Sequence, residues 1–254
     1  MVIIKKLYRA LVPTSVRKSS VVAKLRSLNL KPPNLKPLQL KPPNLKPLKL
    51  KLKSLLVGQH DSIYDSDYYK DNVEGPATRS AGRIADSILN DFKAASVIDV
   101  GCGTGSLLEA LRERGCEVFG LEYAKAALRY CRARGLNVAK FDLKKDVLNE
   151  NRTFDVAVSM EVAEHLPETV ADRYVDLLTR LSRIVVLTAA PPGQGGTSHI
   201  NEQPPSYWIT KFQQWGFEHV EELSQRWRET WEATGDVEWW YHQNLMIFRR
   251  VRSI

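Results

Sequence analysis

Two histidines in the second half of the chain are the side chains best suited to acid–base chemistry. His165 ends the sequence Glu161-Val162-Ala163-Glu164-His165, and His199 lies in a later segment rich in glycine and proline. Each follows a predicted parallel strand, and open α/β sheets bind their ligands at the carboxyl ends of such strands. An imidazole placed there can take a proton from a hydroxyl group, which contributes about 10² to 10⁴-fold to a rate. We therefore predict that both histidines act as bases in one site.

A glycine-rich turn earlier in the chain offers a place for a nucleotide-sized ligand. It reads Val97-Ile98-Asp99-Val100-Gly101-Cys102-Gly103-Thr104-Gly105-Ser106. The β-branched run predicts a buried strand, and a helix is expected to begin near Ser106. Glycines remove the Cβ atoms that would keep a ligand off the backbone, and the helix N-terminus adds unpaired N–H groups. The spacing fits neither the phosphate-binding loop, which ends in Gly-Lys-Ser/Thr, nor the dinucleotide fingerprint, whose third glycine comes one residue later.

Acidic residues follow the next three predicted strands, where they could bind the rest of such a ligand. The second strand, residues 117–121, ends at Glu122, whose carboxylate can accept hydrogen bonds from both hydroxyls of a ribose. The third strand, residues 138–141, precedes Asp142 and Leu143, and the fourth, residues 154–159, runs into Glu161. Acids at three successive strand ends favour one binding site over three unrelated surface carboxylates.

The glycine turn resembles the Asp-x-Gly-x-Gly-x-Gly motif of class I S-adenosylmethionine-dependent methyltransferases. It implies S-adenosylmethionine as the cofactor. The residues that it implies in cofactor binding are Asp99, Gly101, Gly103, Gly105, Glu122, Asp142 and Leu143. In that family the acid after the second strand binds the ribose, and the residues after the third strand meet the adenine amino group and ring.

The run from Glu161 to His165 also resembles the acid-acid-histidine element of ubiquinone-biosynthesis O-methyltransferases and of small-RNA 2′-O-methyltransferases. In those enzymes Glu, Glu, His and a later His hold a divalent metal against the acceptor hydroxyls. The metal ligands implied here are Glu161, Glu164, His165 and His199. Such oxygen and imidazole ligands suit Mg²⁺ or Mn²⁺. Histidines that act as plain bases, without a metal, stay an open alternative.

The elements around these motifs predict an α/β domain over residues 58–254. A helix over residues 77–92 comes first, helices and strands then alternate, and further strands are expected over residues 184–188, 217–221 and 241–249. Residues 222–240, rich in tryptophan, are expected to form an insertion before the last strand. This pattern predicts a Rossmann-like, seven-stranded, mostly parallel sheet with helices on both faces. The connection of residues 189–205 is longer than a link requires, which makes it a candidate functional loop.

The charge of the chain is concentrated before this domain. Residues 1–60 hold 14 of the 37 Lys and Arg and none of the 29 Asp and Glu, so 23 basic residues face 29 acidic ones in the rest of the chain. A proline-rich ten-residue repeat over residues 30–49 predicts extended chain of the polyproline type. We expect residues 1–57 to be a basic, largely disordered tail. Its partner is either an anionic membrane surface or another polyanion, or it is a solvated linker with no specific partner.

No apolar run approaches the length of a membrane span, and the three cysteines (Cys102, Cys116 and Cys131) have no paired or metal-binding spacing. Both features favour a cytoplasmic protein, peripheral at a membrane if the tail attaches there. No Asp/Asn-Pro-Pro-Tyr/Phe motif follows the fourth strand, which argues against methylation of a nucleic-acid base.

Together these patterns predict methyl transfer from S-adenosylmethionine to a hydroxyl of a small molecule or of a sugar or glycan unit. The loop Gly-Gln-Gly-Gly...His-x-Asn-x-Gln-Pro-Pro is similar to that of a subgroup of bacterial-type methyltransferases thought to act on sugars or other small molecules. One alternative is metal-assisted 2′-O-methylation of an RNA 3′ end, which the acidic domain disfavours because its surface repels a polyanion. The other is a non-catalytic cofactor-binding module tethered by its basic tail.

Overall fold

The computed structural model describes residues 63–148 and 152–251. The predictions for residues 1–57, which concern the extended repeat and the anionic partner, lie outside these residues. Within the described ranges, no helix has both the length and the apolar character needed to cross a bilayer.

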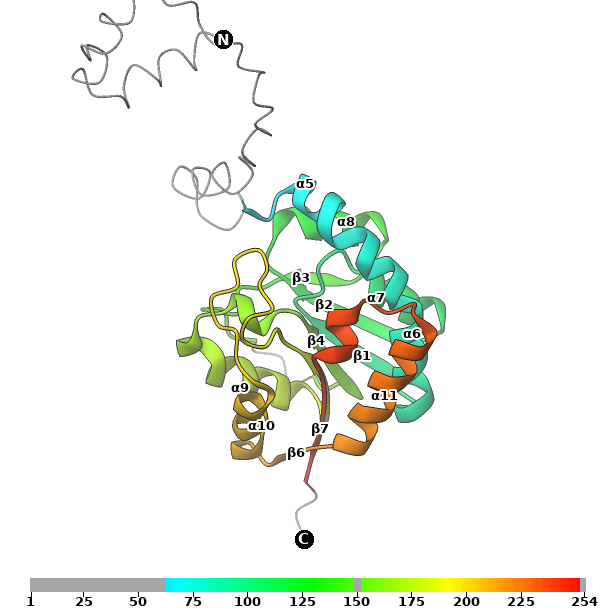
Figure 1. Ribbon diagram of the computed structural model, residues 1–254. Coiled ribbons are helices and arrows are strands. Elements are labelled where there is room, and N and C mark those ends of the chain that lie inside the picture. The colour runs from blue at the N-terminus through cyan, green and yellow to red at the C-terminus, as the bar shows by residue number, and fades with distance from the viewer. Residues whose placement is uncertain (1–62, 149–151, 252–254) are drawn as a thin grey trace, which may run out of the picture. The chain divides into compact units, whose positions relative to one another are not determined.

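A seven-stranded sheet forms the centre of the described part (Figure 1). Its strands are β1 (Ser96–Val100), β2 (Glu117–Glu122), β3 (Val138–Lys140), β4 (Val156–Met160), β5 (Ile184–Thr188), β6 (Phe217–His219) and β7 (Leu245–Arg250). Their order across the sheet is β3-β2-β1-β4-β5-β7-β6, and β7 runs antiparallel to both of its neighbours. The predicted Rossmann-like, mostly parallel sheet is confirmed.

The central strand β1 marks the point where the strand order reverses. It pairs in parallel with β2 on one side, where Val100 is opposite Leu121, and with β4 on the other, where Asp99 is opposite Val158. The connections that leave β1 and β4 therefore run to opposite sides and open a crevice at the carboxyl ends of the strands. Ligands of open α/β sheets bind at such a crevice.

Two layers of helices cover the two faces of the sheet (Figure 1). The first layer is α6 (Glu74–Phe92), α7 (Ser106–Glu113) and α11 (Glu221–Thr234), with α8 (Lys125–Ala133) beside it, and the second is α9 (Ala171–Leu181) and α10 (Pro205–Gln214). Successive side chains of a strand point to opposite faces of the sheet. Val97 therefore packs against the first layer of helices, and Ile98 packs against the second. Because both faces are covered, the central strands read as continuous apolar runs.

The start of the last strand differs from the prediction. Residues 222–240 lie between β6 and β7, as an insertion there requires, and they form most of α11 and the start of α12 (Trp239–Gln243). The last strand, β7, begins at Leu245 instead of residue 241. The apolar stripe of α11 is narrow, consisting mainly of Trp227 and Trp231, so its helical period was hidden among charged residues. Tyr241, at which the predicted strand began, lies in α12; its high strand propensity favoured a strand start there.

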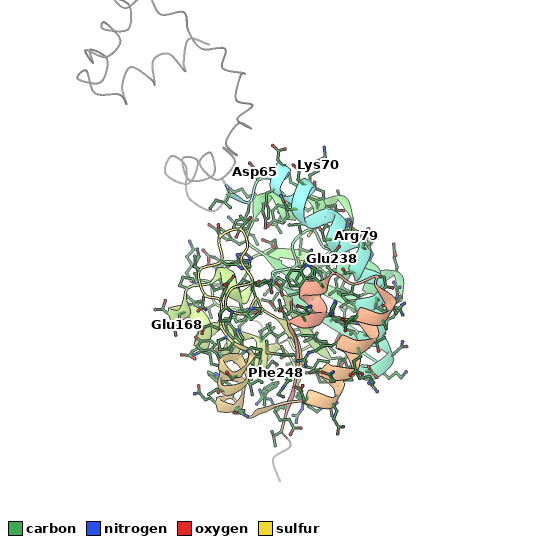
Figure 2. All side chains as sticks on the ribbon, viewed as in Figure 1. Asp65, Lys70, Arg79, Glu168, Glu238 and Phe248 are labelled. Carbon is green, nitrogen blue, oxygen red and sulfur yellow. The ribbon has the colours of Figure 1, made fainter. Side chains whose placement is uncertain are left out.

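Long-range polar contacts fix this C-terminal segment on α6. Arg79 of α6 pairs with Glu238 (Figure 2), and Arg83 pairs with Asp236 at 3.0 Å. The buried indole of Trp231 donates to Ser87 Oγ at 2.9 Å. These contacts hold the residues between β6 and β7 against α6.

Gly120 in β2 provides a test of how tightly the sheet packs against α7, because there is no room for a side chain at this position. A Cβ atom there would lie 2.7 Å from Leu108 Cδ1, 2.8 Å from Cys102 Sγ and 2.9 Å from Val138 Cγ1. We expect Gly120→Ala to lower the free energy of unfolding by about 1–3 kcal/mol, the usual cost of overpacking a core. Chemical denaturation of the variant checks this.

The matched control is Gly82→Ala on α6. A Cβ atom at Gly82 meets only the end of Arg114, at 3.5 Å, so alanine should raise stability by about 0.5–1 kcal/mol through its helix propensity. Equal effects of the two substitutions would contradict the tight fit around Gly120.

Candidate active site

The glycine turn connects β1 to α7 and has the backbone that its sequence requires. Gly101, Gly103 and Gly105 have φ angles of +83°, +54° and +82°, values that side chains rarely permit. A Cβ atom at Gly101 would lie 2.5 Å from Val162 Cγ2, and one at Gly105 would lie 2.5 Å from Leu136 Cδ1. At Gly103 the nearest atom is 3.8 Å away. Packing therefore excludes a side chain at Gly101 and at Gly105, whereas the space over the backbone of Gly103 is open to a ligand.

A cavity of about 560 Å³ lies over this turn. This volume is in the range of small-molecule sites in proteins. Among the predicted cofactor residues, those that line it are Asp99, Gly101, Gly103, Glu122, Asp142 and Leu143. Gly105 instead caps the N-terminus of α7. The structure thus brings the cofactor residues predicted from three strand ends to one cavity.

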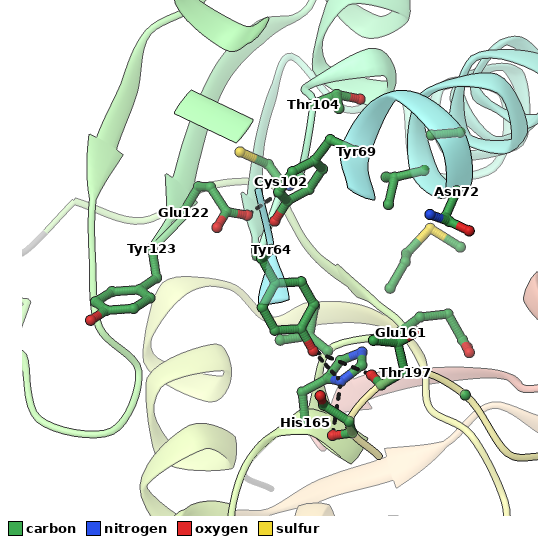
Figure 3. Close-up of a pocket in the computed structure, with 18 of the residues that line it drawn as sticks. Tyr64, Tyr69, Asn72, Cys102, Thr104, Glu122, Tyr123, Glu161, His165 and Thr197 are labelled. Carbon is green, nitrogen blue, oxygen red and sulfur yellow. Dashed lines mark hydrogen bonds between the residues drawn. The ribbon is translucent and has the colours of Figure 1, made fainter. Parts of the chain in front are cut away.

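Glu122 is buried against the glycine turn at the end of β2 (Figure 3). Its carboxylate accepts hydrogen bonds from the backbone N–H groups of Gly103, at 2.9 Å, and Ala124, at 2.6 Å. Burial raises the pKa of Glu122 to about 7, although these hydrogen bonds oppose the shift. Burial, together with the charge of Glu122, raises the pKa of Asp99 to about 7 as well. Two acids under the cavity therefore titrate near neutral pH.

Asp142 and Leu143 lie at the end of β3, on the same cavity. Asp142 is 6% exposed, and its Oδ1 accepts a hydrogen bond from the backbone N–H of Lys144 at 3.0 Å. Leu143 is half-buried. An acceptor and an apolar surface are thus adjacent, which is the combination that the amino group and face of an adenine require.

A tyrosine-rich segment before α6, residues 64–73, helps to line the cavity. It contains Tyr64, the short helix α5 (Ser66–Tyr68) and the π-helical turn η2 (Tyr69–Val73). The Tyr64 hydroxyl donates to the carbonyl of Thr197, at 3.3 Å, and lies 3.0 Å from His165 Nδ1 (Figure 3). Burial raises the pKa of Tyr64, so the phenol stays protonated as a donor. No motif in the sequence pointed to the contact between Tyr64 and His165, which are 101 residues apart.

The two predicted bases, His165 and His199, both line the cavity and meet there. His165 belongs to the short helix η3 (Ala163–His165), and its ring lies edge to face with that of His199, with 4.9 Å between the ring centroids. Glu164 is fully buried, and candidate ligand atoms of these three residues all lie within 4.8 Å of one another. Neither Glu164 oxygen has a hydrogen bond of ordinary length and geometry with a described residue, although the backbone N–H groups of Glu164 and Ala190 favour its ionised form. Burial, and secondarily the charge of Glu161, raises the pKa of Glu164 well above its usual range.

Glu161, the fourth predicted metal ligand, lies outside that group of three. Its backbone has φ +54°, and its two carboxylate oxygens accept hydrogen bonds from Asn244 Nδ2, at 3.0 Å, and Gln194 Nε2, at 3.2 Å. Asn244 Nδ2 also donates to Gln194 Oε1 at 2.9 Å. No sequence signal pointed to Asn244, which lies 83 residues from Glu161.

Glu202 organises the loop of residues 189–205. Its carboxylate accepts hydrogen bonds from the backbone N–H groups of Gly193 and Gly195, both at 2.8 Å, and lies 2.9 Å from His199 Nδ1. The hydrogen bond with His199 is the main cause of a lowered pKa for Glu202. The sequence marked the loop as functional but did not identify this carboxylate.

Known proteins are similar to this domain in sequence and in fold. A family model described as a methyltransferase domain matches residues 76–230. The ubiquinone biosynthesis O-methyltransferase of Alkalilimnicola ehrlichii is 26% identical over 175 residues, which are 65% of this chain and 66% of the relative. That of Methylococcus capsulatus is 35% identical over 92 residues, 34% of this chain and 38% of the relative. The chain thus spans less than two thirds of the length of these relatives.

Solved structures show the same fold at lower identity. One is CalS10 with bound S-adenosylmethionine, an amino pentose methyltransferase from Micromonospora echinaspora, with a TM-score of 0.51, 21% identity and coverage of 67% of this chain and 90% of that chain. Another is the CcbJ methyltransferase from Streptomyces caelestis, with a TM-score of 0.54, 13% identity and coverage of 74% and 96%. At these identities the likeness concerns the fold alone. Because the family model matches more than half of the chain, the chain belongs to the methyltransferase domain family, and the family predicted from its glycine turn is confirmed.

Proposed function

We propose that this chain transfers a methyl group from S-adenosylmethionine to a hydroxyl of a small molecule or of a sugar or glycan unit. The observation that carries the proposal is that one cavity is lined by the glycine turn, the acids Glu122 and Asp142, and the histidines His165 and His199. The names of the relatives, which include O-methyltransferases and a sugar methyltransferase, support the same class of acceptor.

The cofactor half of the cavity suits S-adenosylmethionine in shape and charge. When bound, this cofactor supplies an electrophilic methyl group on a positively charged sulfur. Gly103 lets it approach the backbone, and the buried acids Asp99 and Glu122 favour its positive charge. Glu122 has lone pairs left for two ribose hydroxyls beyond its backbone hydrogen bonds, since each oxygen accepts only one of them.

We expect Glu122→Ala to weaken S-adenosylmethionine binding by about tenfold or more, because hydrogen bonds to a charged group contribute about 1.5–3 kcal/mol each. The affinity of the unchanged chain should rise between pH 6 and pH 8, since the carboxylate, whose pKa is raised to about 7, must lose its proton to accept from both hydroxyls. Titration calorimetry measures both effects. Glu168→Ala, at an exposed glutamate, is the control, and equal affinity of the two variants would remove the ribose assignment.

On the acceptor side the protein must align a hydroxyl and remove its proton. Alignment contributes up to about 7–11 kcal/mol in reactions of this kind, so the enclosing tyrosines and loop matter as much as the base. His165 and His199 lie close enough to serve the same hydroxyl. A proton taken by either ring can leave to solvent once the product has departed.

The decisive experiment is an acceptor panel of catechols, nucleotide sugars and small RNAs, with release of S-adenosylhomocysteine as the readout. We expect turnover with a small hydroxylated acceptor, and His165→Ala should lower kcat by about 10²-fold or more while leaving S-adenosylmethionine affinity within about twofold. His219→Ala, at a histidine hydrogen-bonded to Ser224, is the matched control. Turnover with RNA alone would favour 2′-O-methylation of an RNA 3′ end, and no turnover with any acceptor would favour a non-catalytic module.

A divalent cation fits the residues on this side. Neither oxygen of the buried Glu164 carboxylate has a hydrogen bond of ordinary length and geometry with a described residue, and His165 and His199 are next to it. A carboxylate with two imidazoles suits Mn²⁺ better than Mg²⁺, which prefers oxygen ligands. When bound, such an ion would lower the pKa of an acceptor hydroxyl. We include Mn²⁺ or Mg²⁺ in the proposal with these three residues as ligands, and Glu161 as a fourth ligand only if it leaves Asn244.

If Glu164 is a ligand, Glu164→Gln should lower the affinity for Mn²⁺ by about tenfold or more, because the amide lacks the negative charge. The loss of the electron paramagnetic resonance signal of free Mn²⁺ measures binding directly, without a methyl acceptor. Glu168→Gln serves as the control. Failure of the unchanged chain to bind Mn²⁺, together with turnover that a chelator leaves undiminished, would make both histidines plain bases.

Attachment of residues 1–57 to an anionic surface stays a prediction that rests on their charge alone.

A further inference from the structure

We propose that Arg134 is a positioning residue for the cofactor, because its guanidinium group joins the glycine turn to the start of α6. It thereby holds together two parts of the cavity wall that are far apart in the sequence. Arg134 is not among the described residues that line the cavity, so it acts through residues that do. The inference rests on the proposed function only for the identity of the ligand, S-adenosylmethionine.

Arg134 caps the C-terminus of α8 and makes polar contacts with three other segments. Its Nη1 donates to the backbone carbonyl of Thr104 at 3.1 Å, and its Nε donates to Glu109 of α7 at 2.7 Å. Its Nη2 donates to Glu74, the first residue of α6. A guanidinium group has five N–H donors in one fixed plane, so it can hold three acceptors at once. Because the side chain is only 15% exposed, water screens these contacts less than it screens a surface ion pair.

The contact with Thr104 helps to fix the peptide planes of the glycine turn. The thiol of Cys131, also on α8, donates to the carbonyl of Gly103 at 3.2 Å. Two consecutive carbonyls of the turn are therefore held by donors on or next to α8. Since the N–H and C=O of a trans peptide point in opposite directions, the Thr104 N–H is turned away from Cys131. Gly103 and Thr104 both line the cavity, so these contacts fix the backbone on which a cofactor would lie.

Glu74 connects the same guanidinium group to the tyrosine-rich segment. It follows directly on η2, whose residues Tyr69 and Val73 line the cavity. Val73 lies beside the open space over the turn, because its Cγ1 is the atom found 3.8 Å from a Cβ placed on Gly103. The segment and the turn are thus two adjacent walls of one cavity. Arg134 holds the first wall through Glu74 and the second through its contact with the turn.

No other cation among the described residues contacts Glu74. Its Oε1 accepts the hydrogen bond from Arg134, and its Oε2 is buried without a hydrogen bond from a described residue. Loss of the guanidinium group would leave the charge of Glu74 without its cation and would loosen the start of α6. The tyrosine-rich segment would then have to be ordered when the cofactor binds, which lowers affinity.

We expect Arg134→Gln to weaken S-adenosylmethionine binding by about tenfold or more, because it removes hydrogen bonds between charged groups. The KM for the cofactor should rise by the same factor, with kcat within about twofold once bound cofactor has ordered the wall again. Arg134→Lys keeps the charge but cannot hold all three acceptors, so it should recover part of the affinity. Titration calorimetry on the full chain measures the affinities.

The matched control is Arg114→Gln, at a second arginine that joins α7 to α6. Arg114 donates to Asp86 at 2.7 Å and to the carbonyl of Ala110 at 2.9 Å, and none of these three residues lines the cavity. Its loss should leave cofactor affinity within about twofold, since the contact is of the same kind but away from the cavity wall.

Glu74→Gln tests the connection to the tyrosine-rich segment separately. It should weaken cofactor binding by about threefold or more, and its effect should not add fully to that of Arg134→Gln, because both remove one contact. Hydrogen exchange without cofactor gives a second measurement. The amides of residues 69–73 should exchange about tenfold faster in Arg134→Gln than in Arg114→Gln or the unchanged chain.

Unaltered cofactor affinity in Arg134→Gln and Glu74→Gln, or equal weakening by Arg114→Gln, would overturn the inference. If the unchanged chain does not bind S-adenosylmethionine, the proposed function fails. The exchange rates of residues 69–73 would in that case still decide whether Arg134 holds this wall of the cavity.

Discussion

The burial of acidic side chains at one edge of the sheet is the constraint on which the rest of the site depends. Asp99, Glu122, Asp142 and Glu164 are each at most 7% exposed. A buried carboxylate is costly unless hydrogen bonds or a cation stabilise its charge. Asp99 lies on the central strand and the others follow β2, β3 and β4, so the parallel strands themselves gather these groups. The topology therefore builds a site that favours a positively charged ligand.

Hydrogen bonds divide these acids into two groups. Glu122 is satisfied by the backbone of Gly103 and Ala124, and Asp142 by that of Lys144, so the cofactor half of the cavity is formed before anything binds. Glu164 has no hydrogen bond of ordinary length and geometry to either oxygen from a described residue. Its charge must be offset by a proton, by an imidazolium or by a bound cation. The carboxylate of Glu164 therefore depends on its ligand for compensation, whereas Glu122 and Asp142 already have backbone donors.

This division also explains what the sequence could predict. The glycine turn and the acids after β2 and β3 are local features, because a strand, its terminal residue and the next helix are consecutive in the chain. The contacts of the acceptor half join residues far apart: Tyr64 meets His165 across 101 positions, and Asn244 meets Glu161 across 83. No periodicity or motif records such pairs. Even Glu202, only three residues from His199, was hidden because its role depends on the loop conformation.

The acceptor half is also where chains that share this fold can diverge without losing the cofactor. Part of its lining comes from the loop of residues 189–205 and from Trp239, Trp240 and Tyr241 before β7, which lie outside the strands of the sheet. Ile200 and Trp239 border the cavity and are 63% and 48% exposed, so they offer apolar surface to a ligand there. An aromatic or sugar ring that stacks on Trp239 would bury both surfaces. These two exposed side chains therefore offer a ligand apolar surface in addition to the buried acids and the glycine turn.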